Sequence, residues 1–112
     1  REGRTLEFAP LLAYLADGPG AGEGAAVFHA TLAAGIADWV AGAARAHGLT
    51  RVALGGGCWA NARLATGVRQ ELAAAGLTVY QAERVPPGDG GLSLGQAWVA
   101  LLGVRREEGG DR

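Results

Sequence analysis

The feature that most constrains the fold is a run of three glycines between a short apolar segment and an apolar helical repeat. Val52–Leu54 is a β-branched and aliphatic run, and Gly55–Gly57 follow it directly. Beyond the glycines, apolar residues recur every four positions, at Ala60, Leu64, Val68 and Leu72. This pattern predicts a strand, a tight turn and a helix.

A glycine turn at the start of a helix can bind an anion. The first backbone N–H groups of a helix have no partner within it, and the helix dipole favours negative charge there. Because Gly55–Gly57 carry no side chains, a nucleotide phosphate or ribose could approach their backbone closely. The alternative is a glycine-rich connection that binds nothing, and three glycines alone do not decide between the two.

A second strand is predicted after this helix. Ala73–Gly76 ends the helical pattern, and Leu77–Tyr80 is apolar and β-branched. Strand, helix and strand at this spacing predict a parallel pair with a right-handed crossover, hence an α/β fold. Two parallel strands are a poor structure in isolation, so we expect further strands elsewhere, or self-association that covers the open sheet edge.

Asp89 is the candidate metal ligand. It stands between glycines in Val85–Gln96, which follows the second strand, just before a helix predicted over Leu92–Leu102. Asp89 could cap that helix, or it could face the same cleft as the glycines and bind a divalent cation that bridges to phosphate oxygens. Ser93 and Gln96 are weaker candidates, since either could solvate the first helical turn.

The remaining segments predict a helical framework. A short helix is expected over Thr5–Ala16, a glycine-rich loop over Asp17–Gly24 and a long helix over Ala25–His47. The apolar face expected on the long helix consists of Phe28, Leu32, Ile36, Trp39, Val40 and Ala43. We interpret His29 as hydrogen-bonded within the packing, with a catalytic or metal role as the alternative. The apolar residues of the last helix, among them Leu94, Trp98 and Leu101, are interpreted as core.

Composition excludes several classes of protein. A net charge of −1 gives no basic field that would attract nucleic acid or anionic lipid. The single cysteine, Cys58, excludes an internal disulfide and fits the reducing cytoplasm. We find no apolar run of the roughly 18–20 residues needed to cross a membrane. The chain contains no methionine, so we expect it to be a piece of a longer protein.

Three stretches resemble the carboxyl-terminal end of the HypF family, the carbamoyltransferases of nickel–iron hydrogenase maturation. They are FHATL at residues 28–32, VALGGGCWANARL at 52–64 and RVPPGDGGLSLGQ at 84–96. The resemblance implies that residues 1–104 are part of the second lobe of the carbamoyltransferase domain and that 105–112 form a flexible tail. It also implies a lobe of the actin-like, Hsp70-like ATPase (ASKHA) fold, of which this segment would supply two parallel strands with flanking helices.

The resemblance also implies site residues and cofactors. Gly56, Gly57 and Asn61 would line an ATP site, and Asp89 would bind a divalent metal near the phosphates. The other metal ligands in the family are two histidines in an H-x-x-x-H motif, which this sequence does not contain. His29 and His47 do not reproduce that spacing.

The implied reaction uses carbamoyl phosphate and ATP to form carbamoyl-adenylate. The carbamoyl group then passes to the carboxyl-terminal cysteine of HypE, in the synthesis of the hydrogenase cyanide ligands. The segment alone is expected to be inactive. Cys58 could be a thiol carrier, but we interpret it as a small buried hydrophobe. The alternative function is a non-catalytic module for nucleotide binding or protein interaction that retains only this segment.

Overall fold

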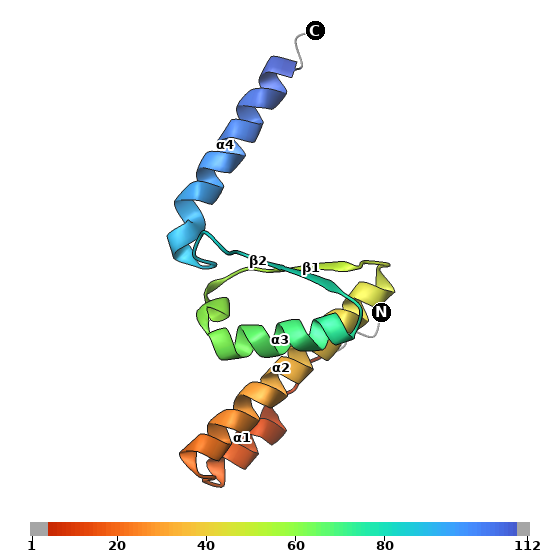
Figure 1. The fold of residues 1–112 in the computed structure, drawn as a ribbon, viewed down its shortest axis with the longest axis vertical. Coiled ribbons are helices and arrows are strands. Elements are labelled where there is room, and N and C mark those ends of the chain that lie inside the picture. Colours follow the sequence, from red (N-terminus) through yellow and green to blue (C-terminus); the bar gives the residue numbers. More distant parts are fainter. Residues whose placement is uncertain (1–4, 110–112) are drawn as a thin grey trace.

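The computed structural model describes residues 5–109, and the side chains of residues 5–103. Three helices gather on one side of a small sheet, and a fourth projects from the other side (Figure 1). Because of this projection the chain measures 66 × 33 × 24 Å along its principal axes. The elements are α1 (Ala9–Ala16), α2 (Ala21–Ala46), β1 (Arg51–Leu54), the 3-10 turn η1 (Gly57–Ala60), α3 (Ala62–Ala74), β2 (Thr78–Gln81), the 3-10 turn η2 (Asp89–Gly91) and α4 (Leu92–Gly109).

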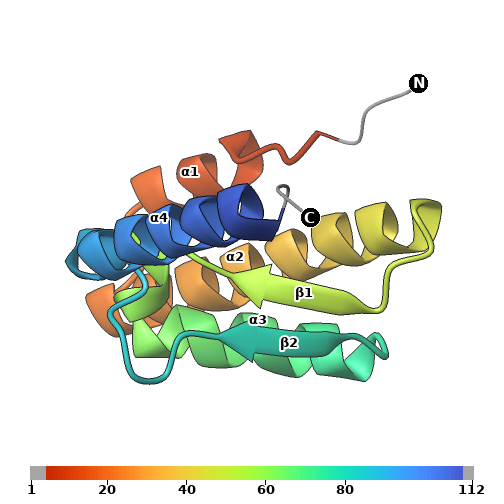
Figure 2. The same cartoon turned by 90° about the horizontal axis from the view of Figure 1, so that it is seen from above.

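The sheet is a parallel pair, as the sequence predicts. Strands β1 and β2 pair in a register that runs from Arg51 opposite Thr78 to Leu54 opposite Gln81. Helix α3 connects them and covers one face of the sheet, while no element of residues 5–109 lies over the strands on the opposite face (Figures 1 and 2). Strand β2 begins and ends one residue later than predicted. Both strands therefore end at the same edge, where their carboxyl-terminal loops meet.

The same glycine motif leads into each strand. At the end of α2, Gly48 has a φ of 64°, and the N–H of Leu49 donates to the carbonyl of Ala44. At the end of α3, Gly76 has a φ of 80°, and the N–H of Leu77 donates to the carbonyl of Leu72. Both are Schellman caps, in which glycine adopts the left-handed conformation at low cost. They aim both strands in the same direction.

The core lies between α2, α3 and the inner face of the sheet. Val68 and Leu72 on α3 are fully buried, and Leu64 and Leu54 are nearly so. On α2 the buried face consists of small residues: Ala33, Ala37, Ala41 and Ala44. A methyl group added at Gly67 would lie 3.0 Å from Cβ of Ala33, so the two helices approach closely. This close packing confirms the helical repeat predicted on α3.

The predicted apolar face of α2 is partly wrong. Leu32, Ile36 and Val40 only flank the core, and Trp39 is 48% exposed. The reason is that the larger side chains keep the helices apart, whereas the alanine face allows them to touch.

The predicted start of α2 is also wrong. The helix begins at Ala21, inside the predicted glycine loop. Gly24 lies within it and is buried where a methyl group would meet Pro19 and Leu15, so α1 packs closely against this part of α2. Helix α1 begins at Ala9 rather than Thr5, with Pro10 in its first turn as expected.

The expectation that no segment is long and apolar enough to cross a membrane is not met by helix α2. By length and composition it is apolar enough to cross a membrane, with a mean hydropathy of 1.3 over its best window. Such a helix is weak evidence for a membrane span, since the core helix of a globular domain passes the same test. Here the face of α2 that carries Ala33 and Ala37 packs against α3, so we describe it as a core helix.

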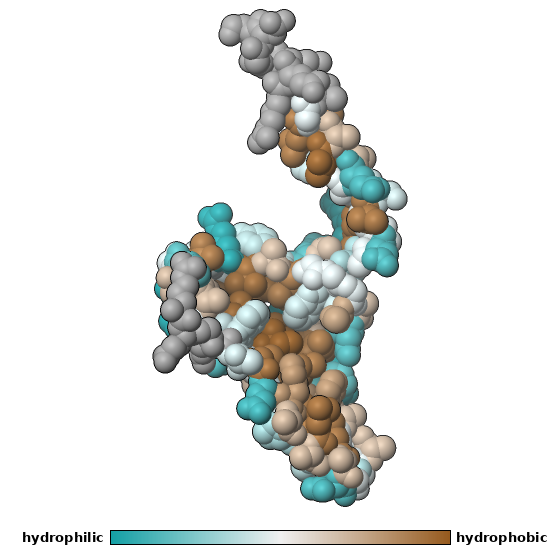
Figure 3. Space-filling view, turned by 180° about the vertical axis from the view of Figure 1, so that it is seen from behind, coloured by the Kyte–Doolittle hydropathy of each residue, from teal (hydrophilic) through white to brown (hydrophobic). Residues whose placement is uncertain are grey.

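Helix α4 contradicts the prediction that its apolar residues form core. Trp98 is 59% exposed and Val99 is 70% exposed, and Leu94, Leu101 and Leu102 are exposed too. The helix projects away from the sheet (Figure 1), and apolar residues lie along the part of it whose side chains the structure describes (Figure 3). It also continues to Gly109, so residues 105–109 of the predicted flexible tail are helical, and 110–112 lie outside the described residues. Nothing in the described part of the chain covers α4 beyond its first turns.

Candidate functional site

The loops that follow the two strands are joined by their backbones. The N–H of Gly56, after β1, donates to the carbonyl oxygen of Pro87, after β2, at 2.7 Å. A methyl group at Gly88 would lie 3.1 Å from Cα of Gly57. The structure therefore brings Gly55–Gly57 and the segment that carries Asp89 to one rim of the sheet, as the topology predicts.

Two glycines at this junction have a structural reason to be glycine. Gly56 has a φ of 108° and a ψ of 162°, a region that only glycine adopts readily. A methyl group at Gly91 would lie 2.6 Å from the carbonyl oxygen of Pro86. Gly55 and Gly57, by contrast, have open space where a side chain would be. The open side of Gly57 is the one where a Cβ would lie, because Gly88 packs against its backbone N and Cα.

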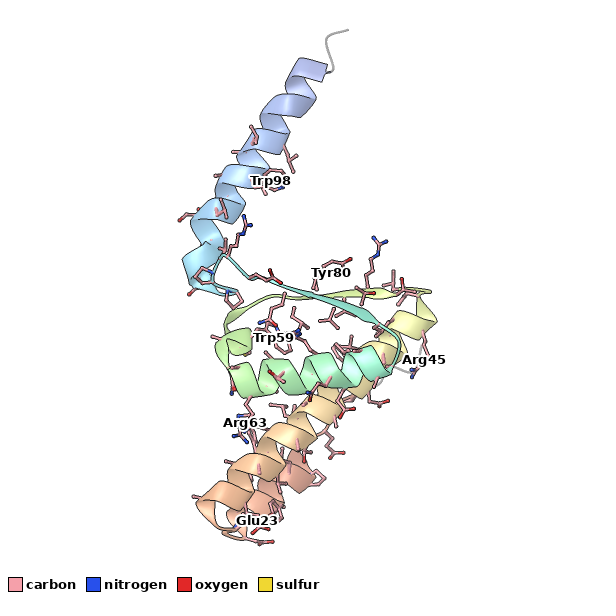
Figure 4. All side chains as sticks on the ribbon, viewed as in Figure 1. Glu23, Arg45, Trp59, Arg63, Tyr80 and Trp98 are labelled. Carbon is pink, nitrogen blue, oxygen red and sulfur yellow. The ribbon has the colours of Figure 1, made fainter. Side chains whose placement is uncertain are left out.

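The glycine turn does not lead directly into an α-helix, which corrects the predicted strand–turn–helix. A 3-10 turn, η1, comes first, and α3 begins only at Ala62. Trp59 fixes this turn, since its indole Nε1–H donates to the carbonyl oxygen of Gly55 at 3.0 Å. Figure 4 shows its ring between the sheet and α3, whereas Tyr80 projects from the open face. The amides of Gly57 and Cys58 are the first of η1, so no carbonyl within the turn accepts from them.

Asn61 is the cap of α3. Its backbone is extended, and its side-chain Oδ1 accepts from the N–H of Leu64 at 3.2 Å. Its Nδ2 lies 3.1 Å from Nε2 of His29 on α2. His29 Nδ1 lies 2.8 Å from the carbonyl oxygen of Ala25. The expectation that His29 is hydrogen-bonded within the packing is confirmed.

Asp89 is exposed and is the first residue of η2. It is not the residue before α4, so the capping interpretation is wrong: Gly91 precedes the helix, and the N–H of Leu92 donates to the main-chain oxygen of Asp89. Within residues 5–109, no group of three or more His, Cys, Asp or Glu side chains could hold a metal ion. Asp89 is thus a lone carboxylate on the loop after β2, and a metal there would need ligands from outside the described residues.

A shallow cavity of about 340 Å³ lies beside the junction. Leu54, Gly55, Gly88 and Gln96 are among the residues that line it. The predicted site residues Gly56, Gly57, Asn61 and Asp89 do not line it, and neither does Ser93. Gln81, which pairs with Leu54 at the end of β2, was missed by the sequence reasoning. Its Oε1 is buried and accepts no hydrogen bond from any residue that the structure describes.

A family model for the carbamoyltransferase Kae1-like domain, second subdomain, matches residues 4–96. The chain belongs to the HypF carbamoyltransferase family. It is 48% identical to carbamoyltransferase HypF2 of Cupriavidus necator over an alignment of 99 residues. That alignment covers 88% of this chain and 12% of the relative. The chain is 52% identical over 80 residues, 71% of the chain and 20% of the relative, to a HypF homolog of the same organism. A HypF of Rhizobium leguminosarum bv. viciae is 47% identical over 105 residues, 92% of the chain and 14% of the relative.

The chain therefore spans between 12% and 20% of the length of these HypF relatives. No solved structure matches it significantly. The family assignment confirms the resemblance read from residues 28–32, 52–64 and 84–96, all of which fall inside the matched region.

Cys58 of this HypF segment is exposed and is not part of a disulfide, so its interpretation as a buried hydrophobe is wrong. It lies in η1, which turns its side chain away from the core that Trp59 contacts. The pairing of His29 with Asn61 was also missed. The two residues are 32 positions apart, and no spacing in the sequence signals a contact between them.

Proposed function

We propose that this segment supplies one wall of the ATP site of a HypF-type carbamoyltransferase. The observation that carries the proposal is the junction between Gly56 and Pro87, within a chain of the HypF family. It sets two glycine-rich loops side by side at the carboxyl ends of parallel strands, where open α/β sheets bind their ligands. The finer proposal for the fold is the second lobe of an ASKHA-type ATPase.

The residues of the rim would hold the nucleotide through their backbones. Gly57, with its side open, would let a phosphate or ribose approach the first amides of η1. Asn61 would contribute by holding the start of α3.

Asp89 would provide one oxygen ligand to a divalent metal at the phosphates. A carboxylate is the ligand that hard cations prefer, and this one is exposed at the rim. The metal would neutralise phosphate charge. The remaining ligands would come from the earlier lobe.

The proposed reaction is that of the family. Water would release phosphate from carbamoyl phosphate, and the resulting carbamate would attack the α-phosphate of ATP to give carbamoyl-adenylate and pyrophosphate. The carboxyl-terminal cysteine thiol of HypE would then take the carbamoyl group as AMP leaves, in the cytoplasm. The segment's own part is positioning and charge stabilisation by backbone donors. The apolar face of α4 would be covered by the rest of the domain or by a second copy, so the segment alone would self-associate.

The test uses a segment-swap protein, a complete HypF relative in which residues 4–96 of this chain replace the matching segment. We expect it to bind ATP and metal, and we expect Asp89→Ala to weaken metal binding by about tenfold or more, or ~1.4 kcal/mol. Isothermal titration with ATP and Mg²⁺ measures both affinities.

The matched control is Asp17→Ala, which removes an exposed carboxylate at the end of α1, far from the rim in sequence. It should leave both affinities unchanged. If Asp89→Ala binds metal as tightly as the unmodified swap, Asp89 has no part in the mechanism.

A further inference from the structure

We infer that His29 is a positioning residue that orients the carboxamide of Asn61 and thereby fixes the start of α3 beside the glycine turn. The inference rests on the proposed nucleotide site, which it deepens by naming a residue from another helix that supports it. Three hydrogen bonds connect Ala25, His29, Asn61 and Leu64 in series.

The direction of each bond follows from the chemistry of the first. A carbonyl oxygen can only accept, so the imidazole nitrogen that faces the carbonyl of Ala25, Nδ1, carries the proton. In the neutral ring Nε2 then holds the lone pair and must accept from the Nδ2–H of Asn61. This leaves the Oδ1 of Asn61 to accept from Leu64 and cap the helix.

The opposite orientation of the carboxamide is excluded on the same grounds. It would set Oδ1 against the lone pair of His29 and the NH₂ group against the N–H of Leu64, so both bonds would be lost. His29 therefore selects one of two orientations of Asn61. The ring of His29 is itself held, because it meets the ring of Phe28 edge-on at a centroid distance of 5.4 Å.

The position of Asn61 connects this relay, the series of hydrogen bonds from Ala25 to Leu64, to the proposed nucleotide site. Asn61 is the hinge between η1 and α3, and its N–H donates to the carbonyl of Cys58 at 3.2 Å. The glycine turn, η1 and Asn61 thus form one hydrogen-bonded unit that is tied to α2 through His29. Without the acceptor on His29, the carboxamide of Asn61 is free to rotate. Water then competes with its Oδ1 for the N–H of Leu64.

NMR of the 112-residue chain tests the relay directly, since it contains two histidines and His47 serves as the internal reference. At a pH where both rings are neutral, we expect His29 in the Nδ1–H tautomer and a coupling or exchange-protected signal from the Nδ2 protons of Asn61. In His29→Leu, which fills the space without an acceptor, the Leu64 amide should exchange faster. His29→Gln, whose side-chain oxygen can accept, should restore much of its protection. An Nε2–H tautomer at His29, or an unchanged Leu64 amide in His29→Leu, would overturn the relay.

The functional arm uses the segment-swap protein. His29→Leu should raise the KM for ATP several-fold with a smaller change in kcat, His29→Gln should raise it less, and His47→Gln should not change it. If the unmodified swap fails to bind ATP, the proposed function fails, whatever the NMR shows. If it binds ATP and His29→Leu binds equally well, the positioning role is wrong while the proposed function stands.

Discussion

The N–H of Gly56 donates to the carbonyl oxygen of Pro87 at 2.7 Å, and this bond joins the ends of two parallel strands. It is reached only because Gly56 adopts a positive φ and because Gly88 lets the second loop approach within contact of Gly57. The geometry of the rim is therefore set by contacts between backbone groups.

Replacement of Gly56 should destabilise the chain. Gly56→Ala forces a side chain into the region reserved for glycine and should cost about 1–3 kcal/mol. Gly55→Ala is the matched control, because its added methyl group meets open space, and it should change stability by less than about 0.5 kcal/mol. Urea unfolding followed by circular dichroism measures both. Equal stabilities for the two variants would show that the backbone conformation at Gly56 carries no strain for alanine.

Truncation of a leucine side chain should lower the free energy of unfolding on α3 but not on α4. Leu72→Ala removes a fully buried side chain and should cost about 2–5 kcal/mol. Leu101→Ala makes the same chemical change on an exposed helix and should cost less than about 0.5 kcal/mol in the monomer. Thermal unfolding at low concentration compares them. A large loss for Leu101→Ala would mean that α4 folds back onto the domain in solution.

The exposed apolar face of α4 predicts self-association of the 112-residue chain. The double variant Trp98→Ser, Val99→Lys removes two of the exposed apolar side chains of α4 and should shift the chain from oligomer to monomer in sedimentation velocity. Gln70→Lys, an exposed polar position on α3, should leave the distribution unchanged. A monomeric unmodified chain at all concentrations would contradict the prediction.

The hydrogen bond between Tyr14 on α1 and Glu23 on α2 should make the stability of the fold depend on pH. The Tyr14 hydroxyl donates to Glu23 at 3.0 Å, and this hydrogen bond, with a smaller contribution from desolvation, raises the pKa of Tyr14 above 10.0. Because the folded pKa is the higher one, the bond stabilises the fold below pH 10 and is lost as the pH rises through the folded pKa. The effect is small because the pair is exposed.

Absorbance titration of the phenolate in a Tyr80→Phe background measures Tyr14 alone, since the chain has two tyrosines. Glu23→Gln should lower the pKa of Tyr14 toward its ordinary value. Tyr14→Phe should be less stable than the unmodified chain at pH 8, and the difference in stability should shrink as the pH rises above 10. A difference that grows with pH would reverse the sign and contradict the assignment.

The sequence predicts the parts of the fold that local periodicity controls. The spacing of Leu64, Val68 and Leu72, with glycines on either side, is enough for the β1–α3–β2 unit and for its parallel pairing, though not for the exact register. The carboxyl-end rule then places Gly56 near Asp89. These steps need only local pattern and chain topology.

What the sequence does not predict depends on partners far away or outside the chain. Helix α2 contains Gly24 because α1 packs against it, although glycine locally disfavours a helix. The apolar residues of α4 are indistinguishable from core residues by pattern, and they are exposed because the described chain offers nothing to cover them. The contact between His29 and Asn61 joins two helices and has no sequence period.

The central claim, that the backbone at Gly57 receives a nucleotide, is tested most directly by Gly57→Ala in the segment-swap protein. Its φ is not positive and the added methyl group meets open space, so stability should not change. If ATP approaches that backbone, the methyl group should weaken ATP binding by about tenfold or more, or ~1.4 kcal/mol. Gly22→Ala, equally open on α2, should leave the affinity unchanged. An ATP affinity in Gly57→Ala equal to that of the unmodified protein would contradict the account.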